Sequence, residues 1–181
     1  GRILGLSISR KIFGKLFAII GPIFRSRNVI DNNLNIFSKR AVSLNKEKIV
    51  NEMWNNYGKT FIEYVFLNYF HKRESHLQIA GEENLLQVTQ KSRPVIFISG
   101  HLANFELMSM EISKRGIQLA TIYRPLNNFF LNPFMEFLRK TYVCPNQVKK
   151  EINGVRDTIK YLNKKHSIAL MIDQRVSEGE K

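Results

Sequence analysis

The chain has 181 residues, of which 44% are hydrophobic and 24% are charged, so it is long and apolar enough for one folded domain and is not disordered throughout. Lysine and arginine outnumber acidic residues 28 to 15, a formal net charge of +13. Such an excess indicates an anionic partner: nucleic acid, an anionic membrane, a phosphorylated lipid or an acidic protein. The single cysteine, Cys144, excludes an internal disulfide and a metal site made of thiolates, and we expect it to be a small packed residue.

The N-terminal segment is apolar and basic. Residues 11–24 read Lys-Ile-Phe-Gly-Lys-Leu-Phe-Ala-Ile-Ile-Gly-Pro-Ile-Phe, which falls short of the roughly 18–20 apolar residues that a spanning helix needs. Five basic residues flank or interrupt it: Arg10, Lys11, Lys15, Arg25 and Arg27. We predict that residues 1–30 form a helical segment that associates with a membrane surface, with a core helix at the domain edge as the alternative.

The rest of the chain, residues 31–181, is predicted to be one domain. Apolar residues recur at spacings of three and four over residues 45–70, which indicates an amphipathic helix. Three strands and three helices are then predicted in alternation: strands at 95–99, 118–123 and 167–172, and helices at 105–115, 133–140 and 154–164. This order predicts an α/β fold with a mostly parallel sheet flanked by helices. Because the polar residues 177–181 follow a strand directly, we also expect the chain to be a fragment whose C-terminal part is missing.

Charged side chains follow all three predicted strands. His101 comes after the first strand, Arg124 after the second and Asp173 after the third. Sites of open parallel sheets lie just beyond the carboxyl ends of the strands, so these side chains are expected at one edge. The other three histidines, His71, His76 and His166, lack such a setting and are expected at the solvated surface.

His101 and Glu106 are five residues apart, which predicts a catalytic pair. Histidine is the natural general base near neutral pH, and a carboxylate can hold one ring nitrogen and stabilise the imidazolium. On one continuous helix the two would be separated by about 140° of rotation. The pair therefore requires His101 in the turn after the strand, which Gly100 makes easy, and Glu106 in the first helical turns. The alternative is a histidine and a glutamate that only support the helix start.

These residues belong to a block that resembles a known family. Phe97-Ile-Ser-Gly-His-Leu-Ala-Asn-Phe-Glu106 resembles the H-x4-E block of the lysophospholipid acyltransferase superfamily, and most closely that of the lauroyl/myristoyl acyltransferases of lipid A biosynthesis. Further blocks resemble that family in order and approximate spacing: Tyr123-Arg-Pro125 with Asn127-Asn128, Phe137-Leu-Arg139, Asn153-Gly-Val-Arg156, and Met171-Ile-Asp173-Gln174. The resemblance implies a glycerol-phosphate-acyltransferase-like fold.

The resemblance also implies a reaction. An acyl chain would pass from a thioester, on acyl carrier protein or coenzyme A, to a hydroxyl of a phosphorylated lipid A precursor, with His101 as base and Glu106 orienting it. Five residues are implied in substrate binding, the arginines through phosphate: Arg124, Arg139, Asp173, Gln174 and Asn104. No cofactor, metal or nucleic-acid partner is expected, and the implied location is the cytoplasmic face of the bacterial inner membrane.

Two alternatives remain open. One is a glycerophospholipid acyltransferase of the lysophosphatidate type, although that group usually has aspartate where this chain has Glu106. The other is a basic module that binds a membrane surface or nucleic acid. Its basic residues are scattered, however, and no nucleic-acid-binding motif is present.

Overall fold

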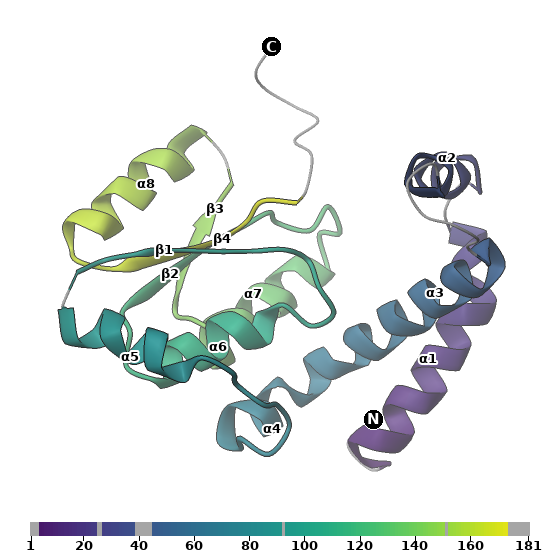
Figure 1. Ribbon diagram of the computed structural model, residues 1–181, viewed down its shortest axis with the longest axis horizontal. Coiled ribbons are helices and arrows are strands. Elements are labelled where there is room, and N and C mark those ends of the chain that lie inside the picture. Colours follow the sequence, from purple (N-terminus) through teal and green to yellow (C-terminus); the bar gives the residue numbers. More distant parts are fainter. Residues whose placement is uncertain (1–3, 25–26, 39–44, 92, 151, 174–181) are drawn as a thin grey trace. The chain divides into compact units, whose positions relative to one another are not determined.

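The computed structural model describes residues 4–24, 27–38, 45–91, 93–150 and 152–173 (Figure 1). The chain divides into two compact units, Gly1–Phe66 and Leu67–Lys181. The end of the predicted membrane-associating segment, residue 30, lies inside a helix of the first unit.

The first unit is helical. Its described elements are α1 (Gly5–Phe24), α2 (Arg27–Ser38), α3 (Lys46–Glu63) and the short 3₁₀ helix η1 (Tyr64–Phe66). The helices α1 and α3 pack closely, because a Cβ atom on Gly58 would lie only 2.2 Å from the carbonyl oxygen of Phe13. Arg10 Nε also donates to Glu63 Oε1 over 2.7 Å. None of the helices that the structure describes combines the length with the apolar composition that crossing a bilayer requires.

The second unit alternates helices and strands. Its elements in chain order are α4 (Leu67–Lys72), α5 (Glu82–Lys91), β1 (Ile96–Ser99), α6 (Glu106–Lys114), β2 (Leu119–Tyr123), α7 (Leu131–Tyr142), β3 (Asn146–Lys149), α8 (Ile152–Asn163) and β4 (Ser167–Met171). The strands form one four-stranded sheet in the order β1-β4-β2-β3, and every pairing is parallel. The helices α5, α6 and α7 lie on one face of this sheet and α8 lies on the other (Figure 1). The prediction of an α/β fold with a parallel sheet flanked by helices is confirmed.

The core of the sheet is apolar under α8. Ala120, Val148 and Ile168, on the three strands β2, β3 and β4, are each at most 2% exposed. The edge strand β1 is less covered: Ile96 and Ile98 pair in register with Ile168 and Leu170, so they belong to the same face, yet they are 56% and 61% exposed. Coverage by α8 therefore does not extend over β1.

Most elements lie where the sequence pattern predicted them. The strands at 95–99, 118–123 and 167–172 correspond to β1, β2 and β4, and the three predicted helices correspond to α6, α7 and α8. Gly116 follows α6 in a left-handed conformation, with φ of +78°, which is typical of the residue after a helix. Cys144 is only 1% exposed, which confirms a packed cysteine.

Several details differ from prediction. The strand β3 and the helix α5 were not predicted, and the helix predicted over 45–70 is interrupted by η1 before α4. The surface position predicted for His76 is wrong: its side chain is 3% exposed and lies 3.8 Å from Glu111. The ring packs against Phe70 with centroids 4.7 Å apart, so the histidine joins the contact between α4 and α6.

Candidate active site

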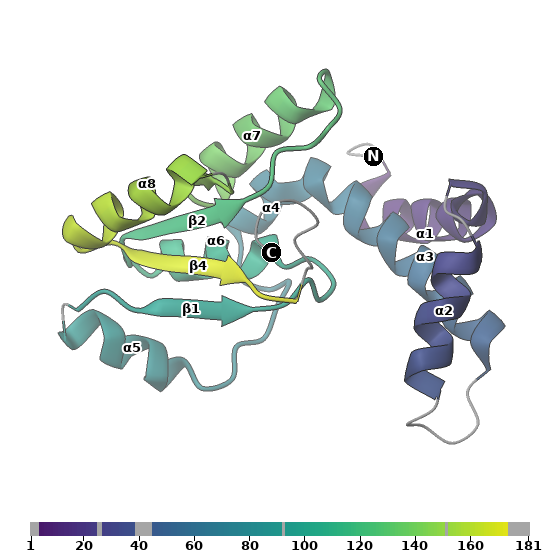
Figure 2. The ribbon, with the colours of Figure 1, turned by 90° about the horizontal axis from the view of Figure 1, so that it is seen from above.

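The candidate site lies at the carboxyl edge of the sheet. Figure 2 shows the labelled strands β1, β2 and β4 pointing to one side, where the loops that follow β1 and β2 also lie. His101 follows β1, Arg124 follows β2 and Asp173 follows β4 by two residues. The three strands therefore end at the same edge of the sheet, as predicted, and each is followed there by one of these residues.

His101 is bonded to Asp173 through both its ring and its backbone. The distance from His101 Nδ1 to Asp173 Oδ1 is 2.7 Å, and the backbone N–H of His101 donates to Asp173 Oδ2 over 2.7 Å. The ring also lies against Phe105 in an edge-to-face arrangement, with centroids 4.7 Å apart. The side chains of His101 and Asp173 are 36% and 44% exposed, so the pair is accessible to solvent.

Strand register explains this contact. Ser99 pairs with Met171 at the end of the β1–β4 ladder, and Ile172 N still donates to Ser99 O over 3.1 Å. Two residues further along, His101 is level with Asp173. Gly100 leaves room for the carboxylate, because a Cβ atom there would lie 3.1 Å from Asp173 Oδ2.

The contact determines which ring nitrogen is available for chemistry. The side-chain and backbone hydrogen bonds from His101 hold the pKa of Asp173 below its usual value, so Asp173 is ionised at neutral pH. An ionised carboxylate only accepts hydrogen bonds, which assigns the proton of the neutral ring to Nδ1. Nε2 of His101 then carries the free lone pair and is the atom that can take a proton from a substrate.

Glu106, the predicted partner of the imidazole, is bonded elsewhere. It is the first residue of α6, as predicted, but its Oε1 accepts a 2.7 Å hydrogen bond from Arg139 Nε on α7. The two side chains are 7% and 9% exposed, so this is a buried ion pair. The guanidinium of Arg139 also lies over the ring of Tyr123, 5.6 Å from its centroid. In this geometry Glu106 joins α6 to α7, and Asp173 is the carboxylate that holds His101.

The other predicted site residues are spread along the same loops. Arg124 is exposed directly after β2, whereas Arg139 is only 8% exposed and is engaged by Glu106, which is a poor setting for a phosphate ligand. Asn104 lies in the turn between His101 and α6 and is partly buried. Gln174 lies outside the described residues.

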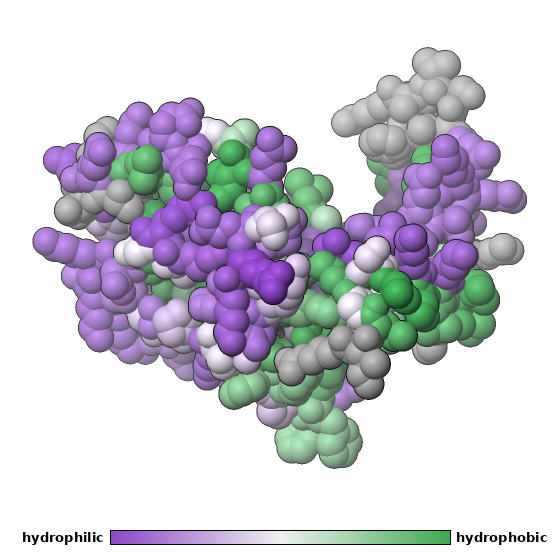
Figure 3. Space-filling view, turned by 90° about the horizontal axis from the view of Figure 1, so that it is seen from below, coloured by the Kyte–Doolittle hydropathy of each residue, from purple (hydrophilic) through white to green (hydrophobic). Residues whose placement is uncertain are grey.

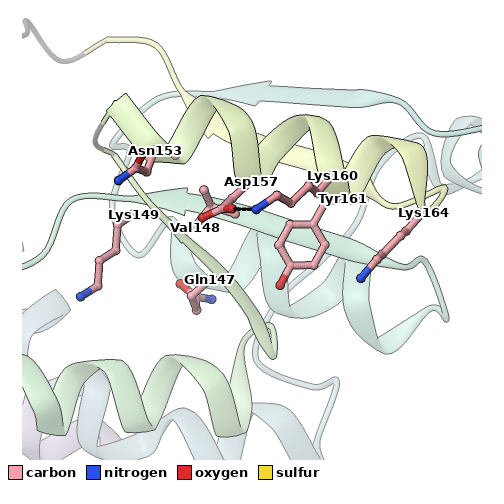
Figure 4. Close-up of a pocket in the computed structure, with 9 residues that line it drawn as sticks. Gln147, Val148, Lys149, Asn153, Asp157, Lys160, Tyr161 and Lys164 are labelled. Carbon is pink, nitrogen blue, oxygen red and sulfur yellow. Dashed lines mark hydrogen bonds and ion pairs between the residues drawn. The ribbon is translucent and has the colours of Figure 1, made fainter.

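A pocket of about 470 Å³ lies on the opposite edge of the sheet, between β3 and α8 (Figure 4). It is lined mainly by polar and basic residues: Gln147, Val148, Lys149, Asn153, Gly154, Asp157, Lys160, Tyr161 and Lys164. Lys160 is bonded to Asp157 over 2.9 Å, while Lys149 and Lys164 are exposed at the two ends of the pocket. The pocket is therefore a cationic surface, separate from the strand that carries His101.

A parallel α/β unit that presents a carboxylate-bonded histidine at the carboxyl edge of its sheet has the arrangement of an enzyme that uses a general base. The sequence comparison makes the class specific. Residues 2–181 match the family model described as bacterial lipid A biosynthesis acyltransferase, and the chain belongs to that family. It is therefore an acyltransferase of lipid A biosynthesis. No curated protein matches the chain closely enough to be counted as a relative.

Proposed function

We propose that this acyltransferase moves a lauroyl- or myristoyl-type chain from a thioester carrier to a hydroxyl of a phosphorylated lipid A precursor, with His101 as general base. The observation that carries this proposal is the His101 ring held by Asp173 at the open edge of the sheet, with Nε2 left to accept a proton. A base in this position typically contributes about 10²–10⁴-fold to the rate.

In the proposed reaction the acceptor hydroxyl gives its proton to Nε2 of His101 as its oxygen attacks the thioester carbonyl. Asp173 stabilises the imidazolium that forms. The tetrahedral intermediate then collapses, the carbon–sulfur bond breaks, and the imidazolium returns the proton to the leaving thiolate. Backbone N–H groups of residues 103–105, in the turn before α6, are the proposed donors to the developing oxyanion, since those of Leu107 and Met108 already donate to the carbonyls of Asn104 and Phe105.

In this proposal Glu106 and Arg139 have a structural role and do not contact the substrate. Their buried ion pair joins the start of α6 to α7 and thereby positions the turn that carries His101. Arg124, exposed after β2, is the proposed ligand for a phosphate of the acceptor, since a guanidinium suits bidentate contact with phosphate. Asn104, in the same turn as His101, is the proposed substrate contact on that side.

We propose acyl carrier protein as the donor, because an acidic protein suits the cationic pocket between β3 and α8. Three strand spacings separate β3 from β1, about 14 Å, so the carrier's flexible arm would cross the sheet edge to reach His101. Replacing Lys149 and Lys164 by glutamate should then raise KM for the acylated carrier protein at least several-fold and leave KM for acyl coenzyme A unchanged. Equal effects on the two donors would contradict this assignment.

The membrane and the cytoplasmic face of the inner membrane are the proposed location, because the acceptor is a lipid and α1 exposes large aliphatic side chains. Ile19 and Ile23 are 75% and 80% exposed. Both face outward on a helix that lies in a basic segment, as an interfacial helix requires.

The experiment that tests the function uses the complete protein, a bis-phosphorylated lipid A precursor and, as the competing acceptor, lysophosphatidate. We expect transfer to the lipid A precursor and its loss in His101→Ala, with circular dichroism confirming that the variant folds. Transfer to lysophosphatidate alone would instead support the glycerophospholipid alternative. Full activity in a folded His101→Ala variant would remove His101 as the base.

A further inference from the structure

Four phenylalanines are exposed together where the β2–α7 loop enters α7. Phe129 and Phe130 are 82% and 89% exposed, and Phe134 and Phe137 are 50% and 59% exposed. Figure 3 shows apolar atoms projecting from the surface at the lower edge of the view. Soluble proteins rarely expose so many large apolar side chains side by side, and where they do, the patch marks an interaction site.

The helix itself prevents these rings from joining the core. Met135, Leu138 and Arg139 form the buried side of α7 and are each at most 8% exposed. Phe130, Phe134 and Phe137 are spaced by four and three residues, so they form a separate stripe along the helix. We call Phe129, Phe130, Phe134 and Phe137 the phenylalanine surface. It lies on the exposed side of α7 and of the loop before it, because the other side of the helix packs into the core.

The loop is held in this conformation by two asparagines. Asn128 Oδ1 accepts from the backbone N–H groups of Phe130 and Leu131, each over 3.0 Å. Asn132 Oδ1 accepts from Leu126 N over 2.8 Å, and Asn132 N donates to Asn128 O over 2.9 Å. The exposed rings therefore project from a hydrogen-bonded turn.

The charges around this surface suit an anionic partner. Glu136 is the single acidic residue between positions 124 and 142. Its carboxylate accepts from Tyr123 over 2.7 Å and from Asn132 over 2.9 Å, and these bonds lower its pKa. Arg124 and Lys140 are both exposed at the two ends of the segment. Exposed aromatic rings flanked by basic side chains are the composition of a segment that lies in the headgroup region of a bilayer.

We propose that the phenylalanine surface docks on an anionic lipid bilayer and turns the carboxyl edge of the sheet toward it. The loop that carries Phe129 and Phe130 leaves the same edge as the turn that carries His101 (Figure 2). Docking would bring a lipid acceptor to the site from the membrane. The inference rests on the proposed function for the identity of that acceptor, whereas binding to the bilayer can be measured without it.

Vesicle binding tests the docking surface directly. The protein is floated with vesicles of phosphatidylglycerol and phosphatidylethanolamine, and with vesicles of phosphatidylcholine alone. We expect the double variant Phe129→Ser, Phe130→Ser to bind the anionic vesicles about tenfold or more weakly, because burying even one such side chain is worth at least a tenfold change in affinity. The matched control is Val155→Ser, Ile159→Ser, which removes two aliphatic side chains of α8 that are 65% and 52% exposed. This control should bind as the unchanged protein does.

A spectroscopic probe tests whether the rings enter the lipid. The chain has one tryptophan, Trp54, in the first unit, so Phe130→Trp in a Trp54→Phe background reports on this surface alone. We expect its emission to shift to the blue on adding anionic vesicles and to be quenched by brominated lipid. An emission that stays that of a water-exposed tryptophan would overturn the proposal.

Three other outcomes would also overturn it. Unchanged vesicle binding in the Phe129, Phe130 variant would assign all binding to other parts of the chain, and an equal loss in the α8 control would make the effect non-specific. If light scattering showed that the variant loses self-association while vesicle binding is unchanged, the surface would be a contact between copies. Activity measurements separate this proposal from the proposed function. The Phe129, Phe130 variant should keep its rate with acceptor dispersed in detergent and lose rate with acceptor in vesicles. His101→Ala should bind vesicles normally and be inactive with both forms of the acceptor.

Discussion

Replacing Glu106 by glutamine removes the negative charge from its buried pair with Arg139 and keeps the size of the side chain. The two side chains are 7% and 9% exposed and 2.7 Å apart, so the guanidinium of Arg139 would stay buried and lose its ion pair with Glu106. Removing one partner of such a pair typically costs about 3–5 kcal/mol. We therefore expect Glu106→Gln to lower the free energy of unfolding of the second unit by that amount and to shift its urea midpoint by about 2 M.

The assay is urea unfolding followed by far-ultraviolet circular dichroism, with amide hydrogen exchange of β2 and β4 to report on the second unit alone. Trp54 fluorescence follows the first unit and should not change. The matched control is Asp157→Asn, which breaks an exposed pair with Lys160 whose side chains are 49% and 71% exposed. Exposed pairs contribute at most about 1 kcal/mol, so the control should stay close to the unchanged protein.

Removing the second charge completes the test. The double variant Glu106→Gln, Arg139→Met removes both charges of this pair, and we expect it to be more stable than Glu106→Gln alone. If Glu106→Gln lowers the free energy of unfolding by less than about 1 kcal/mol and the folded variant is inactive, a structural role of the pair is refuted. Glu106 would then act directly on His101.

Asp173→Asn should lower kcat about 10²-fold or more without unfolding the protein, because the amide cannot stabilise the His101 imidazolium as a carboxylate does; unchanged kinetics would remove Asp173 from the mechanism. Since the folded pKa of Asp173 lies below its ordinary value of about 3.9, its stabilising contact should be complete above that pH and be lost only as pH falls through the lower folded pKa, which a carbon-13 titration of its carboxyl would follow. The Cys144 thiol, whose pKa is raised by burial, should react with a thiol reagent only after unfolding, and rapid reaction of the native protein would contradict its packing. Gly58→Ala should destabilise the first unit by about 1–3 kcal/mol, because the new methyl group would meet the carbonyl oxygen of Phe13, and Trp54 fluorescence during urea unfolding would measure the loss.

Hydrophobic periodicity predicted the strands and helices that have a clear apolar side. It missed β3, because Asn146-Gln-Val-Lys149 has one buried apolar residue, Val148, and no apolar run. An edge strand needs to bury only one face against a neighbouring helix, so its pattern is weak. The surface position predicted for His76 was wrong because its burial depends on tertiary contacts: the ring packs against Phe70 on α4 and lies near Glu111 on α6, 35 residues further along the chain.

The site shows more sharply what sequence spacing can predict. Spacing correctly placed His101 in the turn after β1 and Glu106 at the start of α6, since both positions are local. Which carboxylate holds the imidazole depends on strand order, because His101 meets Asp173 only if β4 lies beside β1. The register Ser99 to Met171, extended by two residues, leads directly to that pair. A charged residue two positions beyond a strand is therefore a candidate partner for every residue at the same level of the neighbouring strands. Here the turn after β1 has two carboxylates near it: Glu106, buried with Arg139, and Asp173, exposed to solvent.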